Sequence, residues 1–376
     1  MQSLSILIVV AELNWISTSR MPGALHHAGF EVTVLAPRDA LVTKSRYARR
    51  VGHFPNDCTY PLWVQTLAAA VRSQAPALIV PGDDRSSALL HRVITDPPPG
   101  LIPSLHARLS DLIQRSLGDP RFYEVASNKF LLGDAALAAG VRVPDQRVVE
   151  GVDAAIEAAR HFRYPAVVKR QHGSGGDTVR VVHDDAGVVQ FCAQVSDRNV
   201  LVQAFVKGQP AAFGAVSLGG LFLAGITAIR LTTDPPETGP GTVVQLADRP
   251  DVAAAAAKMI EVLGISGFSS FDFLLEEETG LAYLLECNPR ISVSSYIGTH
   301  FGADLSRELY KALAGAREAN RPAPPVPLRE QTIALFPQEW LRSPQSAALR
   351  SCVIDAPWDD PELFAATVKG AGVWPG

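Results

Sequence analysis

The segment 271–290 carries carboxylate and carboxamide side chains at strand spacing. Two apolar runs flank an acidic turn near Thr279, and this pattern predicts a β-hairpin. If the turn centres there, Asp272 lies opposite Glu286, and Asn288 shares the face of Glu286 because side chains alternate with period two. Two carboxylates and an amide are hard oxygen ligands, suited to Mg²⁺ that also holds the phosphates of a nucleotide.

A solvated hairpin with incidental acids is the alternative. It fits the three glutamates at 276–278, which cluster at the turn. Glu286 differs, because it ends an apolar strand, where a carboxylate needs a partner or a metal. Arg290 follows two residues after Asn288 and supplies a cationic fork that can hold phosphate or carboxylate.

A second polar cluster begins at Lys169, which ends an apolar run. A glycine-rich loop follows and contains Gly173, Ser174, Gly175 and Gly176. Such a loop lets backbone N–H groups approach phosphate closely, although on its own it is more often a flexible surface turn. A lysine that ends a buried strand a few residues before the loop favours anion binding.

Alternating strand and helix patterns precede these motifs. Apolar runs at 5–10, 31–35 and 77–80, separated by helical stretches, predict a βαβ-type domain with a parallel sheet. In such sheets ligands bind beyond the carboxyl ends of the strands. Four polar residues follow strands there: Glu12, Asn14, Asp83 and Asp84. Helix capping or turn formation explains each of them at least as well.

The pattern changes from about Arg121 to that of a small α+β unit. Helices are expected at 128–139, 152–161 and 252–263, and strands at 164–169, 179–182 and 200–205. A proline-rich segment at 323–327 predicts a linker. The tail beyond it carries Trp340, Trp358 and Trp374, so we expect it to pack on the body of the molecule.

The composition limits the class of protein. The chain has 376 residues, which predicts two or three domains. It is 47% hydrophobic, and its net charge of −4 argues against a nucleic-acid or membrane partner. No basic segment precedes the first apolar run, so a signal peptide is not expected. The four cysteines are scattered, without a C-x-x-C pair, which indicates neither a zinc site nor disulfides and favours the cytoplasm.

Taken in order, these motifs resemble the ATP-grasp superfamily, particularly its carboxylate–amine ligases and carbamoyl-phosphate-synthase-like members. The match covers roughly 121–309. It includes Asn128-Lys129 at the start of a helix that ends at 140–144, the run ending in Lys169, the loop 173–176, the segment 201–208, and the hairpin that ends in Asn288-Pro289-Arg290. Each motif is weak alone, whereas their common order is specific.

The resemblance implies an α/β and α+β fold, in which an N-terminal parallel-sheet pre-ATP-grasp domain precedes a two-lobed ATP-grasp fold. The expected divisions are the pre-ATP-grasp domain at 1–120, a small lobe or lid at 121–202, a large lobe with the metal site at 203–320, and a C-terminal extension at 321–376.

The resemblance also implies roles for individual residues. Lys129 and Lys169 would contact nucleotide phosphates, and the loop Gly173, Ser174, Gly175 and Gly176 would cover them. The hinge whose backbone contacts adenine would be Gln203, Ala204, Phe205 and Val206. Mg²⁺, as two ions and with Mn²⁺ as an allowed substitute, would be held by Asp272, Glu286 and Asn288. Arg290, and with it Arg230, would stabilise the transferred phosphoryl group or the acyl-phosphate.

One departure from the family concerns the ribose. Many members carry a glutamate in the hinge or soon after it, and this glutamate holds the ribose hydroxyls. The corresponding segment of this chain, 203–212, contains no acidic residue. Either the ribose contact is weaker here, or Gln203 or Gln209 supplies it.

The activity implied is ATP-dependent ligation of a carboxylate to an amine through an acyl-phosphate, with release of ADP and phosphate. The cofactors would be ATP and Mg²⁺, the partners a small-molecule carboxylate and amine, and a homodimer is allowed. Two alternatives stay open: a bicarbonate or carbamoyl-type enzyme, and a non-catalytic nucleotide-binding subunit.

Overall fold

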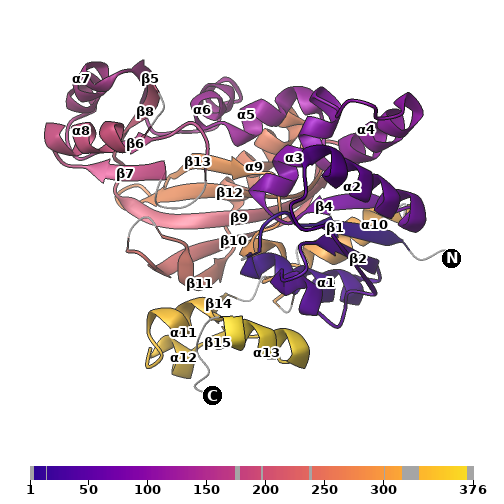
Figure 1. Cartoon of the computed structure of the whole chain (residues 1–376). Coiled ribbons are helices and arrows are strands. Elements are labelled where there is room, and N and C mark those ends of the chain that lie inside the picture. Colours follow the sequence, from indigo (N-terminus) through magenta and orange to yellow (C-terminus); the bar gives the residue numbers. More distant parts are fainter. Residues whose placement is uncertain are drawn as a thin grey trace.

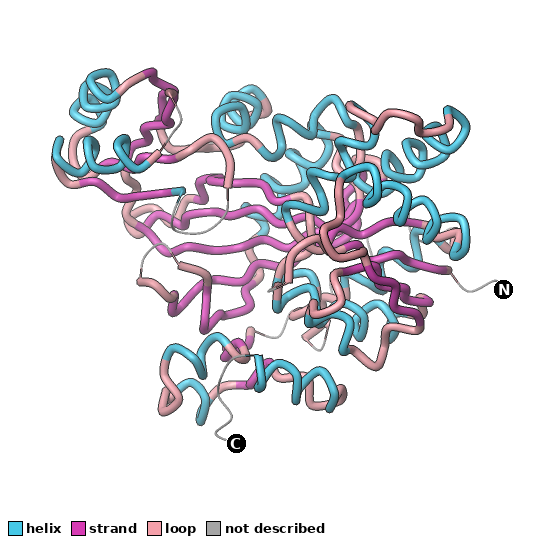
Figure 2. Tube along the Cα trace, in the orientation of Figure 1, coloured by secondary structure: helices cyan, strands magenta, loops and turns pink. Residues whose placement is uncertain are grey.

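The computed structural model describes residues 4–13, 15–173, 178–195, 198–236, 239–299, 301–315 and 330–370. Three sheets organise the chain (Figure 1). A small sheet with two helices lies at the upper left, a long sheet crosses the centre, and the N-terminal domain lies at the right. In Figure 2 the strands of the long sheet run through the middle of the molecule and helices lie outside it.

The N-terminal domain is a parallel sheet with helices on both faces. Its strands are β1 (Ser5–Val9), β2 (Glu31–Ala36), β3 (Arg50–His53) and β4 (Leu78–Pro81), in the order β3-β2-β1-β4. Its helices are α1 (Ile16–Ala28), η1 (Leu41–Lys44), α2 (Tyr60–Gln74), α3 (Asp84–Thr95) and α4 (Pro103–Leu117). Ile6 and Ile8 are buried in one core cluster and Leu7 and Val9 in another. Burial on both faces explains the continuous apolar run.

The small sheet forms a separate layer. Its strands are β5 (Gln146–Glu150), β6 (Ala166–Lys169), β7 (Val179–Val182) and β8 (Asn199–Ala204), in the order β5-β8-β6-β7 with antiparallel pairing. The helices α7 (Val152–Phe162) and α8 (Asp185–Gln194) share a core with Val168 and Val202. Because side chains alternate, Lys169 points to the opposite face.

The long sheet has seven strands in the order β13-β12-β9-β10-β11-β14-β15. They are β9 (Gly208–Leu218), β10 (Leu221–Thr233), β11 (Gly241–Ala247), β12 (Gly267–Glu276), β13 (Ala282–Asn288), β14 (Gln331–Leu335) and β15 (Val353–Asp355). One face packs against η2 (Pro120–Phe122), α5 (Tyr123–Ser127), α6 (Lys129–Ala138) and α9 (Pro250–Leu263). The other face is covered in part by the N-terminal domain, η4 (Val293–Ser295) and α10 (Leu305–Leu313).

The tail packs on the body, as expected. Its helices are α11 (Gln338–Arg342), α12 (Ala348–Ser351) and α13 (Pro361–Gly370). β14 pairs with β11, Arg20 of α1 forms an ion pair with Asp355 at 2.8 Å, and Ser45 donates to Asp360 at 2.7 Å. Trp374 and the predicted linker at 323–327 lie outside the described residues.

The predicted fold class is confirmed: a parallel-sheet domain precedes a small antiparallel lobe and a large lobe whose sheet is antiparallel except for the pair β14–β15. The proposed domain boundaries stay predictions. Two observations bear on them. Ala126 and Leu132 pack with the core of the long sheet rather than with the small one, and β14 and β15 extend the long sheet. Within the described residues, every helix is too short or too polar to cross a membrane.

Candidate active site

The hairpin β12–β13 sets the two acidic side chains opposite each other. Asp272 pairs with Glu286 and Ser270 with Asn288, as the sequence predicts. The ladder is not regular, however. Phe273 pairs with Leu284, so an unbroken register would place Asp272 opposite Leu285; a bulge at this point inserts one residue.

The bulge decides which way Glu286 points. Leu284 and Cys287 both lie in the core under α9, although they are three residues apart. With period-two alternation alone, Glu286 would share the buried face of Leu284. The extra residue turns Glu286 and Asn288 to the face opposite the core, beside Asp272, and the Glu286 side chain keeps 25% exposure.

Two lysines from other elements lie near these carboxylates. Lys129, the first residue of α6, forms an ion pair with Glu286 at 2.9 Å and donates to the carbonyl of Gly173 at 2.6 Å. α6 begins there because the Asn128 side chain caps it by accepting from the N–H of Phe130. Lys169, at the end of β6, is buried, and its pKa is lowered to about 8, chiefly by burial, while Glu286 opposes the lowering.

The two arginines are each matched to a carboxylate of the chain. Arg230 of β10 donates to Asp272 at 2.5 Å. Arg290 donates from Nε and Nη2 to the two carboxylate oxygens of Asp84, at 2.5 and 3.1 Å. The Arg290 guanidinium also lies over the ring of Trp15, 4.3 Å from its centroid.

The donor set fits a divalent cation of the Mg²⁺ type. Asp272, Glu286 and Asn288 offer oxygen atoms on one face of the hairpin, which are the ligands that hard cations prefer. Among the described residues no group of three His, Cys, Asp or Glu side chains gathers for a metal. The carboxamide of Asn288 is therefore needed as the third ligand of such a site.

The profile of the ATP-grasp domain family matches residues 126–294, which include both lysines and the whole hairpin. The carbamoyl phosphate synthase large chain of Thermotoga petrophila is 24% identical over 305 residues, covering 77% of this chain and 26% of the relative. The chain thus spans about a quarter of the length of this curated relative.

The match assigns an ATP-grasp domain to residues 126–294 of the chain. Solved structures show the same fold at low identity. The biotin carboxylase domain of Hydrogenobacter thermophilus 2-oxoglutarate carboxylase, solved with MgADP and bicarbonate, gives a TM-score of 0.62 at 16% identity, covering 84% of this chain and 70% of that one. L-amino acid ligase from Bacillus licheniformis gives 0.61 at 15% identity, covering 88% and 79%.

The predicted hinge lies where the small sheet leads into the long sheet. Gln203 and Ala204 end β8, and Phe205 and Val206 lead into β9, with Phe205 exposed. The Gln203 side chain is buried and donates to Gln146 at 2.7 Å. Its amide is therefore engaged inside the small lobe.

Gln209, the other candidate for the ribose, lies on β9 opposite Leu275. Leu275 belongs to the core under α9, so Gln209 shares that face and not the face of Asp272. Neither glutamine is placed beside the acidic pair, and the ribose contact of this ATP-grasp domain stays unassigned.

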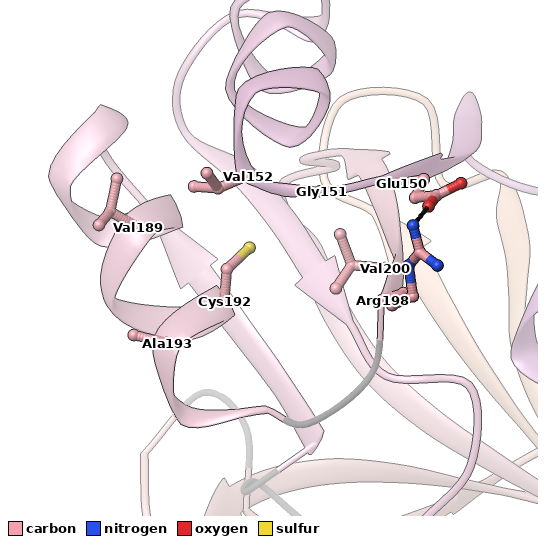
Figure 3. Close-up of a pocket in the computed structure, with 8 residues that line it drawn as sticks. All are labelled: Glu150, Gly151, Val152, Val189, Cys192, Ala193, Arg198 and Val200. Carbon is pink, nitrogen blue, oxygen red and sulfur yellow. Dashed lines mark ion pairs between the residues drawn. The ribbon is translucent and has the colours of Figure 1, made fainter.

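Part of the predicted phosphate loop lies outside the described residues, namely Ser174, Gly175 and Gly176. Gly173 is described, and its carbonyl meets Lys129. A cavity of about 650 Å³ lies on the small lobe, between α7, α8 and β8, where Glu150 and Arg198 form an ion pair (Figure 3). None of the proposed nucleotide or metal residues lines it.

The N-terminal domain contributes a part of the site that the sequence left open. Asp83 is the N-cap of α3 and accepts from Ser86, Ala11 and Glu12, so for Asp83 the capping alternative holds. Asp84 instead binds Arg290. Trp15, whose indole donates a hydrogen bond to Glu12, lies against the Arg290 guanidinium. The sequence did not predict this contact, because no local pattern links two residues so far apart in the chain. Asn14 lies outside the described residues.

Proposed function

We propose that this chain is an ATP-dependent ligase that joins a carboxylate to an amine through an acyl-phosphate and releases ADP and phosphate. The observation that carries the proposal is the convergence of Lys129 and Lys169, from different elements, on a carboxylate pair. Cations opposite metal ligands are what transfer of a γ-phosphoryl group requires, because catalysis there is mainly positioning and charge stabilisation.

Each side chain has a task in this scheme. Lys129 and Lys169 bind phosphate oxygens, and Arg230 and Arg290 stabilise the charge that develops on the transferred group. Asp272, Glu286 and Asn288 would hold Mg²⁺, which when bound neutralises phosphate charge. The substrate carboxylate attacks the γ-phosphorus and ADP leaves; the amine then attacks the acyl carbon and phosphate leaves.

The named relatives support the class and leave the substrates open. One is a carbamoyl phosphate synthase, one an L-amino acid ligase, and one a carboxylase domain solved with bicarbonate. We therefore keep bicarbonate as the second candidate for the carboxylate substrate. Two bound metal ions, use of Mn²⁺, a homodimer and a cytoplasmic location belong to the same proposal.

The test is an ADP-release screen of the purified protein with amino acids and small carboxylic acids, singly and in pairs. An acyl-phosphate route transfers ¹⁸O from the labelled carboxylate into the released phosphate. ADP formation that needs bicarbonate and no organic carboxylate would favour the second candidate. Nucleotide binding without any substrate-dependent ADP release would contradict both and favour a non-catalytic subunit.

A further inference from the structure

The N-terminal domain holds the chain segment that follows the metal-ligand strand. Asp84 binds Arg290, and Ser87, one turn along the same helix, donates to the carbonyl of Pro289 at 3.2 Å. The N–H of Ile291 donates to the carbonyl of Pro81 at 3.2 Å. Three successive residues, directly after the proposed ligand Asn288, are thus fixed by α3 and the end of β4.

Arg290 is the connection between this clamp and Asn288. Its Nη2 atom donates to the Asn288 side-chain oxygen at 3.3 Å, as well as to Asp84, and its Nη1 atom donates to the carbonyl of Ile291 at 3.2 Å. Trp15 covers one face of the guanidinium. The Arg290 side chain is 8% exposed, whereas that of Asp84 is 41% exposed. The arginine therefore has little freedom while Asp84 is present.

The role of Asp84 is separable from capping of α3. Asp83 already caps that helix, with its side chain accepting from the N–H of Ser86 at 2.6 Å. Asp84 is the first residue inside the helix, and both of its carboxylate oxygens face Arg290. Bidentate pairs of this kind fix orientation as well as charge.

We propose that Asp84 is a positioning residue that orients the Asn288 carboxamide through Arg290 and so sets the metal affinity of the hairpin. This inference rests on the proposed function, because it takes Asn288 as a metal ligand. Groups that hold a metal ligand in place typically change metal affinity by about 10–100-fold when they are removed.

The experiment measures Mn²⁺ binding by electron paramagnetic resonance, with saturating ADP present and no turnover. Asp84→Ala is expected to weaken Mn²⁺ binding about tenfold or more, and Asp84→Glu to restore much of it. Asp111→Asn is the matched control, since Asp111 forms an exposed ion pair with Arg115, and it should bind as the wild type does. Thermal melting of each variant checks that the fold is kept.

A double-mutant cycle separates positioning from a general loss of structure. If Asp84 acts through Asn288, Asp84→Ala should change Mn²⁺ affinity by less than about twofold in an Asn288→Ala background. An equal loss in both backgrounds, or no loss in Asp84→Ala while Glu286→Gln weakens binding, would overturn the inference alone. Failure of the wild type to bind Mn²⁺ with ADP would overturn the proposed function, and this inference with it.

Discussion

The two sides of the acidic pair hold their cations differently. On the lysine side, Lys129 pairs with Glu286, but Lys169 is buried and its pKa is lowered to about 8, chiefly because burial disfavours the charged form. On the arginine side, Arg230 and Arg290 each have a carboxylate of the chain as partner, Asp272 and Asp84. A cation kept at a desolvation cost is suited to an anionic ligand, whereas a matched ion pair stabilises the protein without one.

The largest effect on activity is expected from substitution of Glu286, which pairs with Lys129. Glu286→Gln should lower Mg²⁺-dependent ADP formation by about 100-fold or more, because it removes a proposed metal ligand and the counter-charge of Lys129. Glu277→Gln is the matched control on the same hairpin, since Glu277 pairs with the exposed Lys207. Turnover of Glu286→Gln within a few-fold of wild type would remove the metal assignment.

Opposite stability changes are expected from the two sides. The lowering of the Lys169 pKa from 10.5 to about 8 corresponds to roughly 3 kcal/mol of destabilisation at neutral pH. Lys169→Met should therefore leave stability equal or higher by up to about 3 kcal/mol, while nucleotide affinity falls about tenfold or more.

On the arginine side, Arg290→Met should instead destabilise the protein by about 1–3 kcal/mol, because it breaks the contacts to Asp84 and Ile291. Urea unfolding of both variants measures the difference. Stability changes of the same sign in both variants would contradict the contrast between the two sides.

A moderate pH effect follows from Lys169. Its folded-state pKa lies below its ordinary value, so the ammonium is lost as pH rises through about 8. The KM for ATP should be constant below that pH and rise up to about tenfold per pH unit above it. The destabilisation is fully present below pH 8 and declines between about 8 and 10.5, where the unfolded chain holds the extra proton.

The variant Lys169→Arg keeps the charge over this range, because guanidinium does not titrate there. It should make the KM for ATP independent of pH between 7 and 10, in steady-state assays with a pH-stable coupling system. A profile that keeps its inflection near pH 8 in Lys169→Arg would assign it to another group.

The smallest effect concerns the ribose. Among the described residues the two glutamines proposed for it have other partners: Gln203 donates to Gln146, and Gln209, on the α9 side of the sheet, donates to the carbonyl of Arg230. We expect 2′-deoxyATP to replace ATP with kcat/KM reduced by less than about fivefold, less than the loss of one hydrogen bond to a charged group would cause. A reduction of a hundredfold would require an ionised ribose-binding group.

The sequence predicted the pairing of the two acidic residues correctly, but it did not predict the bulge that produces this pairing. The symmetry about Thr279 gave the correct partners, Asp272 and Glu286, but the hairpin reaches that pairing only through the bulge before Glu286. Leu285 is an ordinary apolar residue and gives no signal for a bulge. The strand that ends in Lys169 was predictable because apolar alternation and a terminal lysine are both local patterns.

Contacts between distant segments were not predictable in this way. The pairing of Arg290 with Asp84 joins residues about two hundred positions apart, and the ring of Trp15 over the same guanidinium depends on how two domains pack. Local propensity and periodicity contain no information on such contacts. For the same reason the sequence could not decide between capping and binding for Asp83 and Asp84.

The central claim is that the two lysines and the acidic pair hold MgATP for transfer of its γ-phosphoryl group. Phosphorus NMR of a reaction with a substrate pair found in the screen tests it most directly. The account predicts ADP and inorganic phosphate as products, in equal amounts, with formation dependent on Mg²⁺ and on Glu286. AMP and pyrophosphate would indicate an adenylate intermediate and would contradict both the mechanism and the placement of the phosphates between Lys129 and Lys169.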